Sequence, residues 1–239
     1  MNSSYVVGID VGGQTSKLGV VDARGTVLAQ TVIRTDTYDT VEPYIAELAA
    51  AVKKVIAEAG AEGKIRGVGV GAPNGNYYTG TIEAAPNLRW GHNKVEFAKL
   101  LSEALGGMPV ALTNDANAAA LGEALAGAAK GTKDSIMITL GTGVGGGVIT
   151  DGKVLKGFNS AAGELGHIVI SVGGRQCSCG RHGCWEAYAS ATALINQTRQ
   201  AMLRYPDSVM WKLCEGSLDN VNGITAFNAM REGDIVGKM

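Results

Sequence analysis

The sequence predicts an α/β protein made of two related lobes. Its first half follows the order β-β-β-α-β-α-β-α, in which short β-branched segments alternate with segments of helical apolar spacing. A strand, a glycine turn and a returning strand begin the chain, and this unit recurs about 130 residues later as a weak internal repeat. Because 46% of the 239 residues are hydrophobic, the chain can bury a sizeable core. We assign the first lobe to residues 1–113 and the second to residues 114–239.

The first half is expected to begin with three strands. Apolar, β-branched residues bounded by turns mark these strands and two later ones. The expected strands are residues 5–9, 18–21, 27–33, 68–72 and 110–113. Apolar residues at helical spacing mark three helices. The expected helices are residues 38–58, 95–105 and 116–129. Asn114 or Asp115 is placed to cap the last of them.

The second half is expected to repeat the strand unit and then to become helical. Its expected strands are residues 135–140 and 145–149, and its expected helices are residues 191–205 and 224–231. No later segment matches the buried strands of the first half, although a parallel sheet is covered on both faces. We therefore expect the second lobe to be incomplete, either because the chain is a fragment or because this lobe is unusually small.

Composition and charge exclude several classes of protein. The chain has 21 Lys and Arg against 22 Asp and Glu, for a formal net charge of −1. It therefore has no electrostatic reason to bind nucleic acid or an anionic membrane. No apolar run is long enough to span a bilayer, and the first residues lack the basic start of a signal peptide. We expect a cytoplasmic protein.

Two glycine turns are candidates for binding phosphate. The turns are Gly12-Gly13 and Gly141-Thr142-Gly143. Successive backbone N–H groups in such turns form a concavity for anions, so one turn from each lobe can hold a polyphosphate. The plainer alternative is that these glycines only make tight turns. The second turn also matches a dinucleotide-binding fingerprint, but that fingerprint needs a helix directly after it, and here a strand follows.

Two carboxylates are placed where strands end. Asp10 closes the first strand beside its glycine turn, where it can hold Mg²⁺ through water. Asp115 joins a short buried strand to a helix, and α/β sheets hold ligands in crevices at such positions. Its carboxylate can act as a general base towards a hydroxyl group. The alternative role for Asp115 is that of an N-cap.

Three cysteines form the strongest local signal. Cys177, Cys179 and Cys184 lie close together in the sequence, within eight residues. Three thiolates and one histidine make a ligand set for tetrahedral Zn²⁺, and His167 and His182 are both candidates for the fourth ligand. Because four protein ligands leave no open position, we expect the zinc to be structural.

These motifs, in this order and over essentially the whole chain, resemble the ROK family of sugar kinases, which are bacterial glucokinase-like members of the actin/hexokinase fold. The motifs are Asp10-x-Gly12-Gly13, Pro86-Asn87-Leu88, Asn114-Asp115-Ala116-Asn117, Leu140-Gly141-Thr142-Gly143, Gly163-Glu164-x-Gly166-His167 and Cys177-x-Cys179-Gly180-x-x-Gly183-Cys184-x-Glu186. The fold class implied by the resemblance is an actin/hexokinase-like (ribonuclease H-like) two-lobe fold. The combination of motifs is highly specific, and the cysteine motif is close to diagnostic alone.

The resemblance implies a role for each motif. Asp115 would take the proton from the sugar hydroxyl, and His167 would be the fourth zinc ligand, with its other ring nitrogen facing the sugar. The other sugar-binding residues would be Asn87, Asn114, Glu164 and Glu186. Asp10 would organise Mg²⁺, and both glycine turns would bind the phosphates of ATP. We expect a hexose and ATP as partners, no nucleic acid, no membrane, and a homodimer or homotetramer.

Three departures from the family pattern bear on function. Gln14 stands where threonine is usual and Thr15 comes next, so either residue can contact phosphate. Asn74 stands where glycine is common, which is expected to affect the sugar that is accepted. Family members also continue past the point where this sequence ends, so we expect the chain to lack later strands and part of the adenosine pocket.

The sequence therefore predicts ATP-dependent phosphorylation of a hexose, with glucose at its 6-hydroxyl as the first choice. Fructose, mannose, N-acetylglucosamine and N-acetylmannosamine are alternative acceptors. A sugar-binding remnant without catalysis is a further alternative, because the C-terminal part is short. A sugar-responsive repressor is disfavoured, because family repressors carry a DNA-binding segment before the first strand, which here begins by residue 5.

Overall fold

The protein consists of two compact units in a computed structural model, which describes residues 4–158 and 160–239. The first unit comprises residues 1–137 and 146–163, and the second comprises residues 138–145 and 164–239. The helix that follows residue 113 groups with the first unit. The lobe boundary at residue 113 stays a prediction.

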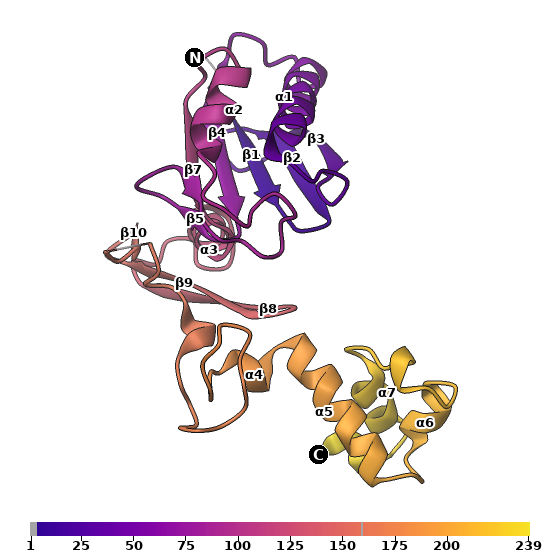
Figure 1. The fold of residues 1–239 in the computed structure, drawn as a ribbon. Coiled ribbons are helices and arrows are strands. Elements are labelled where there is room, and N and C mark those ends of the chain that lie inside the picture. The colour runs from indigo at the N-terminus through magenta and orange to yellow at the C-terminus, as the bar shows by residue number, and fades with distance from the viewer. Residues whose placement is uncertain (1–3, 159) are drawn as a thin grey trace. The chain divides into compact units, whose positions relative to one another are not determined.

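A five-stranded sheet in the order β3-β2-β1-β4-β7 forms the centre of the first unit (Figure 1). Its strands are β1 (Tyr5–Val11), β2 (Thr15–Val21), β3 (Val27–Arg34), β4 (Ile65–Ala72) and β7 (Val110–Asn114). β2 pairs antiparallel with β1 and β3, whereas β1, β4 and β7 run parallel. Every strand expected in this half of the chain is present, and the predicted α/β class is confirmed.

Helices pack on this sheet according to the alternation of side chains along its strands. The helices are α1 (Val41–Glu58), α2 (Phe97–Ala104) and α3 (Asp115–Ala126). In β4, Val68 and Val70 belong to the core that also contains the buried face of α1. The intervening glycines point to the other side, where Gly71 faces α3. α3 ends before the predicted residue 129 because Gly127 departs from helical φ and ψ.

Aromatic rings and hydroxyl groups fix α1 in the core of the first unit. Tyr44 stacks on Trp90, with ring centroids 5.0 Å apart. Its hydroxyl lies 2.7 Å from Ser16 Oγ, which in turn lies 2.7 Å from Thr35 Oγ1. Burial raises the pKa of Tyr44 to about 12, so the phenol remains a neutral hydrogen-bonding group that joins α1 to β2.

Several short strands were not predicted. They are β5 (Gly75–Asn76), β6 (Thr81–Ile82) and β10 (Lys153–Val154). Two-residue strands contain no alternation that a sequence pattern can reveal. The predicted helix at 95–105 begins later because Val95 pairs with Ile82 as an isolated bridge. The remaining predicted strands are present as β8 (Ser135–Leu140) and β9 (Val144–Thr150), in a sheet of order β10-β9-β8.

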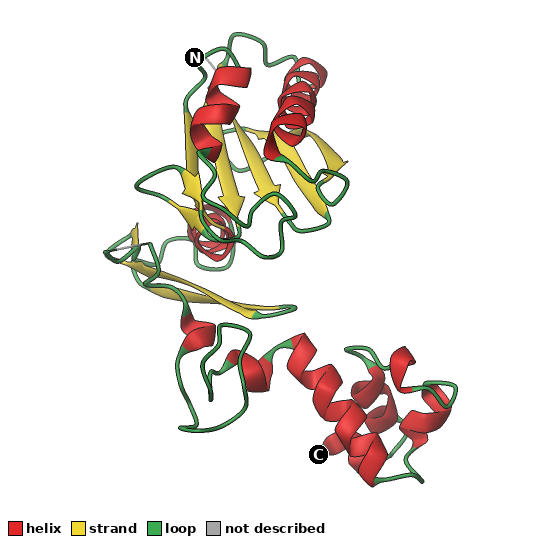
Figure 2. Cartoon of the chain, viewed as in Figure 1, coloured by secondary structure: helices red, strands yellow, loops and turns green. Residues whose placement is uncertain are grey.

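In the second unit, the chain is helical beyond residue 186 (Figure 2). Its elements are η1 (Leu165–His167), α4 (Glu186–Ala189), α5 (Ala191–Arg204), α6 (Val209–Leu213), η2 (Leu218–Asn220), α7 (Thr225–Arg231) and η3 (Val236–Lys238). Ser190 and Ser208 cap α5 and α6 through their hydroxyl groups. A small apolar core lies among these helices and includes Met202, Met210 and Cys214. Within the described ranges, no helix has the length and apolar character needed to cross a membrane.

Candidate functional site

The carboxyl ends of three parallel strands bring the first group of predicted residues to one edge of the sheet. Asp10 of β1 pairs in register with Gly71 of β4, which pairs with Thr113 of β7. Asp115 begins the helix that follows β7, so both predicted carboxylates belong to this edge. Burial raises the pKa of Asp10 and the negative charge of Asp115 raises it further, whereas Lys17 lowers it. The edge therefore concentrates negative charge.

The helix that carries Asp115 is capped by the residue before it. Asn114 has extended backbone angles, and its side-chain oxygen accepts the N–H groups of Ala116 at 2.8 Å and Asn117 at 3.4 Å. Asp115 is therefore the first residue of α3, although its carboxylate also accepts the Ala116 N–H at 2.8 Å. The amide nitrogen of Asn114 takes no part in this cap, so it can donate to a ligand oxygen.

Gly71 is a site-forming residue that the sequence analysis missed. A Cβ atom at this position would lie 2.9 Å from the Ala118 Cβ and 3.4 Å from the Asp115 Cα. Only glycine lets β4 approach the start of α3 this closely. The available signal was the recurrence of glycine at 67, 69 and 71 within one strand, since strand glycines mark close backbone approaches.

The first glycine turn contacts the loop that carries Asn87. A Cβ atom at Gly13 would lie 2.7 Å from the Asn87 carbonyl oxygen. Asn87 is exposed, and the neighbouring Leu88 is fully buried and anchors the loop. The predicted phosphate-binding turn and the predicted sugar-binding loop therefore lie against each other within the first unit, at a distance that a side chain at position 13 would not allow.

The same turn has a fixed backbone. Gly12 donates its N–H to the Thr15 carbonyl at 3.0 Å, and the Gln14 carbonyl accepts the Thr35 N–H at 2.9 Å. These bonds use backbone groups, so the side chains of Gln14 and Thr15 both remain candidates for contact with phosphate.

Asn74 has a structural task in the β5–β6 region. Its backbone has a φ of 53°, a left-handed conformation that asparagine tolerates. Its amide nitrogen donates to the carbonyl groups of Glu83 at 3.1 Å and Ala84 at 2.8 Å. The amide group therefore stabilises a turn, and an influence of Asn74 on sugar choice stays a prediction.

In the second unit, Glu186 joins the glycine turn to the cysteine segment, which comprises residues 165–185. Its carboxylate accepts the Val144 N–H at 3.0 Å and the Ser178 hydroxyl at 2.8 Å. A Cβ atom at Gly143 would overlap the same carboxylate. The turn is closed by the Gly141 N–H, which donates to the Gly143 carbonyl at 3.0 Å. Glu186 therefore shapes this turn, a task the sequence did not reveal.

Two further predicted residues of this unit lie in tight turns. Glu164 is exposed and directly precedes η1, and its carbonyl accepts the His167 N–H at 3.1 Å. The Thr142 carbonyl accepts the hydroxyl of Thr192 at 2.8 Å, which ties the glycine turn to the start of α5. The predicted sugar-binding residues are thus divided between the units: Asn87, Asn114 and Asp115 belong to the first, and Glu164, His167 and Glu186 to the second.

Four side chains in the second unit form a candidate metal centre. The ligand atoms of His167, Cys177, Cys179 and Cys184 lie within 4.8 Å of one another. The Cys179 and Cys184 sulfurs are 3.7 Å apart, as are Cys177 Sγ and His167 Nδ1. Two thiolates bound to tetrahedral zinc at about 2.3 Å lie roughly 3.8 Å apart, so the spacing fits Zn²⁺. In the part of the chain that the structure describes, His182 is not a member of this group.

The thiols of this centre differ in their surroundings. Cys177 and Cys184 are buried, whereas Cys179 is exposed. The backbone N–H of Arg181 lowers the pKa of Cys179 to about 6, and burial raises the pKa of Cys184 to about 11. His167 presents Nδ1 to the Cys177 sulfur, which leaves Nε2 available to another partner.

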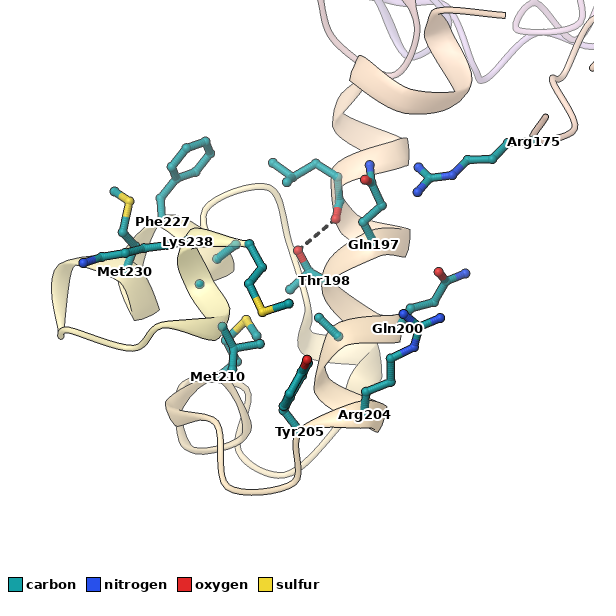
Figure 3. Close-up of a pocket in the computed structure, with 16 residues that line it drawn as sticks. Arg175, Gln197, Thr198, Gln200, Arg204, Tyr205, Met210, Phe227, Met230 and Lys238 are labelled. Atoms are coloured by element: carbon teal, nitrogen blue, oxygen red, sulfur yellow. Dashed lines mark hydrogen bonds between the residues drawn. The ribbon is translucent and has the colours of Figure 1, made fainter. Parts of the chain in front are cut away.

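A cavity of about 450 Å³ lies among the helices of the second unit (Figure 3). Basic side chains from Arg175, Arg204 and Lys238 border it together with apolar Met210 and Phe227. No sequence pattern predicted this cavity. None of the predicted site residues is among the described residues that line it, so it is separate from the metal centre and from the glycine turns.

Comparison with known proteins places these motifs in one family. The profile of the ROK family matches residues 6–238. The chain belongs to the ROK family. A glucokinase from Streptomyces coelicolor is 40% identical over 230 residues, which cover 95% of this chain and 70% of the relative. A xylose repressor from Bacillus subtilis is 30% identical over 241 residues, which cover 96% of this chain and 58% of the repressor.

Solved structures of the same family share the fold. A ROK family glucokinase from Streptomyces griseus, in complex with glucose and AMPPNP, has a TM-score of 0.76 at 36% identity. The match covers 98% of this chain and 73% of that structure. A ROK hexokinase from Thermus thermophilus has a TM-score of 0.78 at 35% identity and covers 98% of this chain and 71% of that structure. These matches confirm the predicted family and its two-lobe kinase fold.

Proposed function

We propose that this protein transfers the terminal phosphate of ATP to the 6-hydroxyl of glucose. An ATP-dependent sugar kinase is the activity that the glucokinase relatives support. The observation that carries the proposal is the position of Asp115 at the carboxyl edge of the sheet. Because Asn114 caps α3, the Asp115 carboxylate is not needed to begin the helix and is available for chemistry.

The reaction needs a base beside the acceptor hydroxyl. The hydroxyl oxygen forms a bond to the γ-phosphorus while the bond from that phosphorus to its bridging oxygen breaks and ADP leaves. The hydroxyl proton passes to the carboxylate of Asp115. Asn87, Asn114, Glu164, His167 and Glu186 are proposed to orient the sugar through its other hydroxyl groups. Orientation of the two reactants supplies much of the rate enhancement in such transfers.

The nucleotide is proposed to contact the two glycine turns and Asp10. Gly12, Gly13, Gln14 and Thr15 provide one set of phosphate contacts, and Gly141, Thr142 and Gly143 provide the other. The Asp10 carboxylate suits Mg²⁺, which prefers oxygen ligands and, when bound with ATP, offsets the charge of the phosphates. The neighbouring charge of Asp115, which raises the pKa of Asp10, is a repulsion that a cation at this edge would relieve.

Zinc is proposed to have a structural role. His167, Cys177, Cys179 and Cys184 have the donor chemistry and spacing of a closed tetrahedral site. With Nδ1 of His167 on the metal, Nε2 is the nitrogen that remains for the sugar. The metal would thereby fix the residues between Glu164 and Glu186.

Other functions remain in competition with glucose phosphorylation. The acceptor can be fructose, mannose, N-acetylglucosamine or N-acetylmannosamine, and a similar solved structure, 25% identical to this chain, is that of a putative N-acetylmannosamine kinase from Listeria monocytogenes. A non-catalytic sugar-binding protein and a sugar-responsive repressor are the other two classes. The cytoplasmic location and the homodimer or homotetramer stay predictions.

Replacement of Asp115 by asparagine tests the proposal. In a coupled assay with ATP and the five sugars, we expect glucose to be the best substrate of the wild-type chain. Asp115→Asn should lower kcat for glucose by about 10²–10⁴-fold, because the amide cannot accept the proton. The melting temperature should not fall, because Asn114 provides the cap and the repulsion of Asp10 is removed.

Two results would contradict this proposal. Near-normal turnover of Asp115→Asn would remove the residue from the role of base. Glucose binding without ATP turnover by the wild-type chain would favour the sugar-binding or repressor alternatives, and these two are separated by whether the protein binds DNA in a glucose-dependent way.

A further inference from the structure

Hydrogen bonds join the β5–β6 hairpin to the segment that follows β10. Asn76 Oδ1 accepts the hydroxyl of Ser160 at 3.2 Å, and the same hydroxyl oxygen accepts the Tyr77 N–H at 3.3 Å. The Tyr78 hydroxyl donates to the Gly157 carbonyl at 3.0 Å. These residues are about 80 positions apart in the sequence, so the contacts are tertiary and not part of a local turn.

The Ser160 backbone is held in an uncommon conformation. Its φ is 66°, in the left-handed region that side chains other than those of glycine and asparagine seldom adopt. A serine there is strained, and its hydroxyl has one acceptor and one donor partner in the hairpin. The position therefore keeps a side chain that makes specific contacts where glycine would relieve strain.

A cation strengthens the same contact. The Lys156 ammonium lies 3.5 Å from the centroid of the Tyr77 ring, and the Tyr77 and Tyr78 rings meet edge to face at 5.7 Å. The hairpin therefore contacts this segment through hydrogen bonds and through an aromatic face that attracts positive charge.

Both sides of this contact lead to residues of the proposed acceptor site. At the base of the hairpin, a Cβ atom at Gly75 would overlap the carbonyl of Thr113, the residue before Asn114. At the end of the other segment, a Cβ atom at Gly163 would lie 3.3 Å from Asn117 Oδ1 of α3. Gly163 directly precedes Glu164 in the chain.

We infer that Asn76, Tyr78 and Ser160 form a latch that positions the acceptor end of the kinase site for its sugar. The inference rests on the proposed function. The latch residues are positioning residues. They act through the segment that directly precedes Glu164 and through β7, the strand that ends at Asn114. Loss of the latch hydrogen bonds should lower the affinity for the sugar, with little effect on the rate of phosphate transfer once the sugar is bound.

Two variants test the latch with minimal change of shape. Tyr78→Phe removes one hydroxyl, and Ser160→Ala removes the other while the strained backbone is retained. Each should raise the KM for glucose about two- to tenfold, the factor that one neutral hydrogen bond contributes, with kcat and the KM for ATP unchanged. Tyr77→Phe is the matched control, because it keeps the ring that Lys156 contacts, and its KM for glucose should equal that of the wild type.

Hydrogen exchange provides a readout that does not depend on activity. Amides of residues 160–164 should exchange faster in Tyr78→Phe and in Ser160→Ala than in Tyr77→Phe. Unchanged exchange in both variants, or faster exchange with unchanged glucose affinity by calorimetry, would overturn the inference. If the wild-type chain phosphorylates no sugar, the proposed function fails, and the latch is then judged from exchange and glucose affinity alone.

Discussion

The first unit is held together by apolar burial, whereas the cysteine segment of the second unit buries few side chains besides those of Cys177 and Cys184. In the first unit, β1, β2 and β4 place their apolar side chains against α1, and Tyr44, Leu48 and Val52 are fully buried. Between Glu164 and Glu186, the apolar residues Ile168, Ile170 and Val172 are exposed by 53%, 56% and 97%. A hydrophobic core therefore accounts for the order of one region and not of the other.

The difference assigns different sources of stability to the two regions. The burial of apolar area stabilises the sheet of the first unit, and this stabilisation does not depend on a bound ligand or metal. A segment without a core needs cross-links, and here the available ones are the turns around Cys177, the carboxylate of Glu186 and the proposed metal. A structural zinc site contributes its binding free energy to folding. The two sources of stability can be separated by perturbing one region at a time.

The largest effect is expected when zinc is withheld. Zinc binding contributes about 10–16 kcal/mol in small zinc peptides, so its loss should unfold the cysteine segment. Cys179→Ala, or treatment with a chelator, should lower the melting temperature of the second unit by more than about 10 °C while the first unit melts unchanged. Calorimetry and elemental analysis measure the two quantities.

Cys214→Ala is the control for this experiment. Cys214 is buried in the helical core of the same unit and lies outside the metal group. Its truncation should cost about 1 kcal/mol through lost packing and leave one zinc per chain. Wild-type protein that contains no zinc, or a Cys179→Ala variant as stable as the wild type, would show that the cysteine segment is ordered without a metal.

The second largest effect is expected at Gly71, where β4 and α3 of the first unit lie too close together for a larger side chain. Gly71→Ala would place a methyl group 2.9 Å from the Ala118 Cβ, so α3 must move away from β4. Such overpacking costs about 1–3 kcal/mol. Because Asp115 begins α3, a shift of this helix should also displace the proposed base. The fall in kcat should therefore be larger than the loss of folded protein accounts for, as kinetics and urea unfolding of the same variant would measure.

Gly69→Ala is the matched control on the same strand and the same face. A Cβ atom there meets nothing within 4 Å. The substitution should be neutral or slightly stabilising, because alanine restricts the unfolded chain. Equal losses in both variants would point to the strand itself and not to the contact with α3.

Much of the fold could be predicted because its signals are local. The strands of the sheet and α1, α5 and α7 follow from apolar periodicity, and Gly127 alone explains why α3 ends early. The β5–β6 hairpin could not be predicted, because two-residue strands depend on tertiary contacts such as the bridge from Ile82 to Val95. The small helix α6 is likewise too short to show a period.

The candidate site was predictable to the extent that its chemistry lies in short motifs. The cysteine spacing indicated a metal centre, and the choice between His167 and His182 rested on resemblance, since sequence distance does not fix spatial distance. The capping role of Asn114 and the contacts of Glu186 depend on side-chain geometry that no spacing encodes. Gly71 was missed because its role is to lack a Cβ atom where β4 meets α3, and that contact is known only from the structure.

A third, smaller effect concerns the helical part of the second unit, whose core is small. Asp234 accepts the Ser208 hydroxyl at 2.6 Å and the Val209 N–H at 2.8 Å, and it thereby ties α6 to the last turn of the chain. These bonds, the Ser208 hydroxyl first, lower the pKa of Asp234. Their stabilisation is present above the ordinary pKa near 3.8 and is lost as the pH falls through the lowered folded value.

Asp234→Ala should therefore destabilise the second unit by about 1 kcal/mol at pH 7, since the carboxylate is partly exposed. The difference from the wild type should shrink as the pH falls below 3.8, the ordinary pKa of the carboxyl group, as thermal melts followed by circular dichroism would record. A difference that is independent of pH would mean that side-chain packing, and not the charge, ties these helices together.

The smallest effect on stability is expected at Asp10, where loss of the carboxylate should stabilise the chain, in contrast to its loss at Asp234. Burial and the charge of Asp115 raise its folded pKa, so ionisation of Asp10 destabilises the folded chain. This penalty is absent below the ordinary pKa of 3.8 and is complete above the raised folded value. Asp10→Asn should therefore increase the melting temperature of the ligand-free protein at pH 7, by no more than about 2 °C because the carboxylate is only partly buried and solvent screens its charge.

Asp22→Asn provides the contrast that makes this small effect informative. Asp22 accepts the N–H groups of Thr26 and Arg24, each at 2.8 Å, and the Thr26 bond is the main reason that its pKa is lowered. Asp22→Asn should lower the melting temperature at pH 7, whereas Asp10→Asn should raise it and abolish phosphate transfer. If Asp10→Asn melts at a lower temperature than Asp22→Asn at pH 7, the Asp10 carboxylate stabilises the edge of the sheet. That result would contradict the interpretation that this carboxylate destabilises the folded chain and is there to bind a cation.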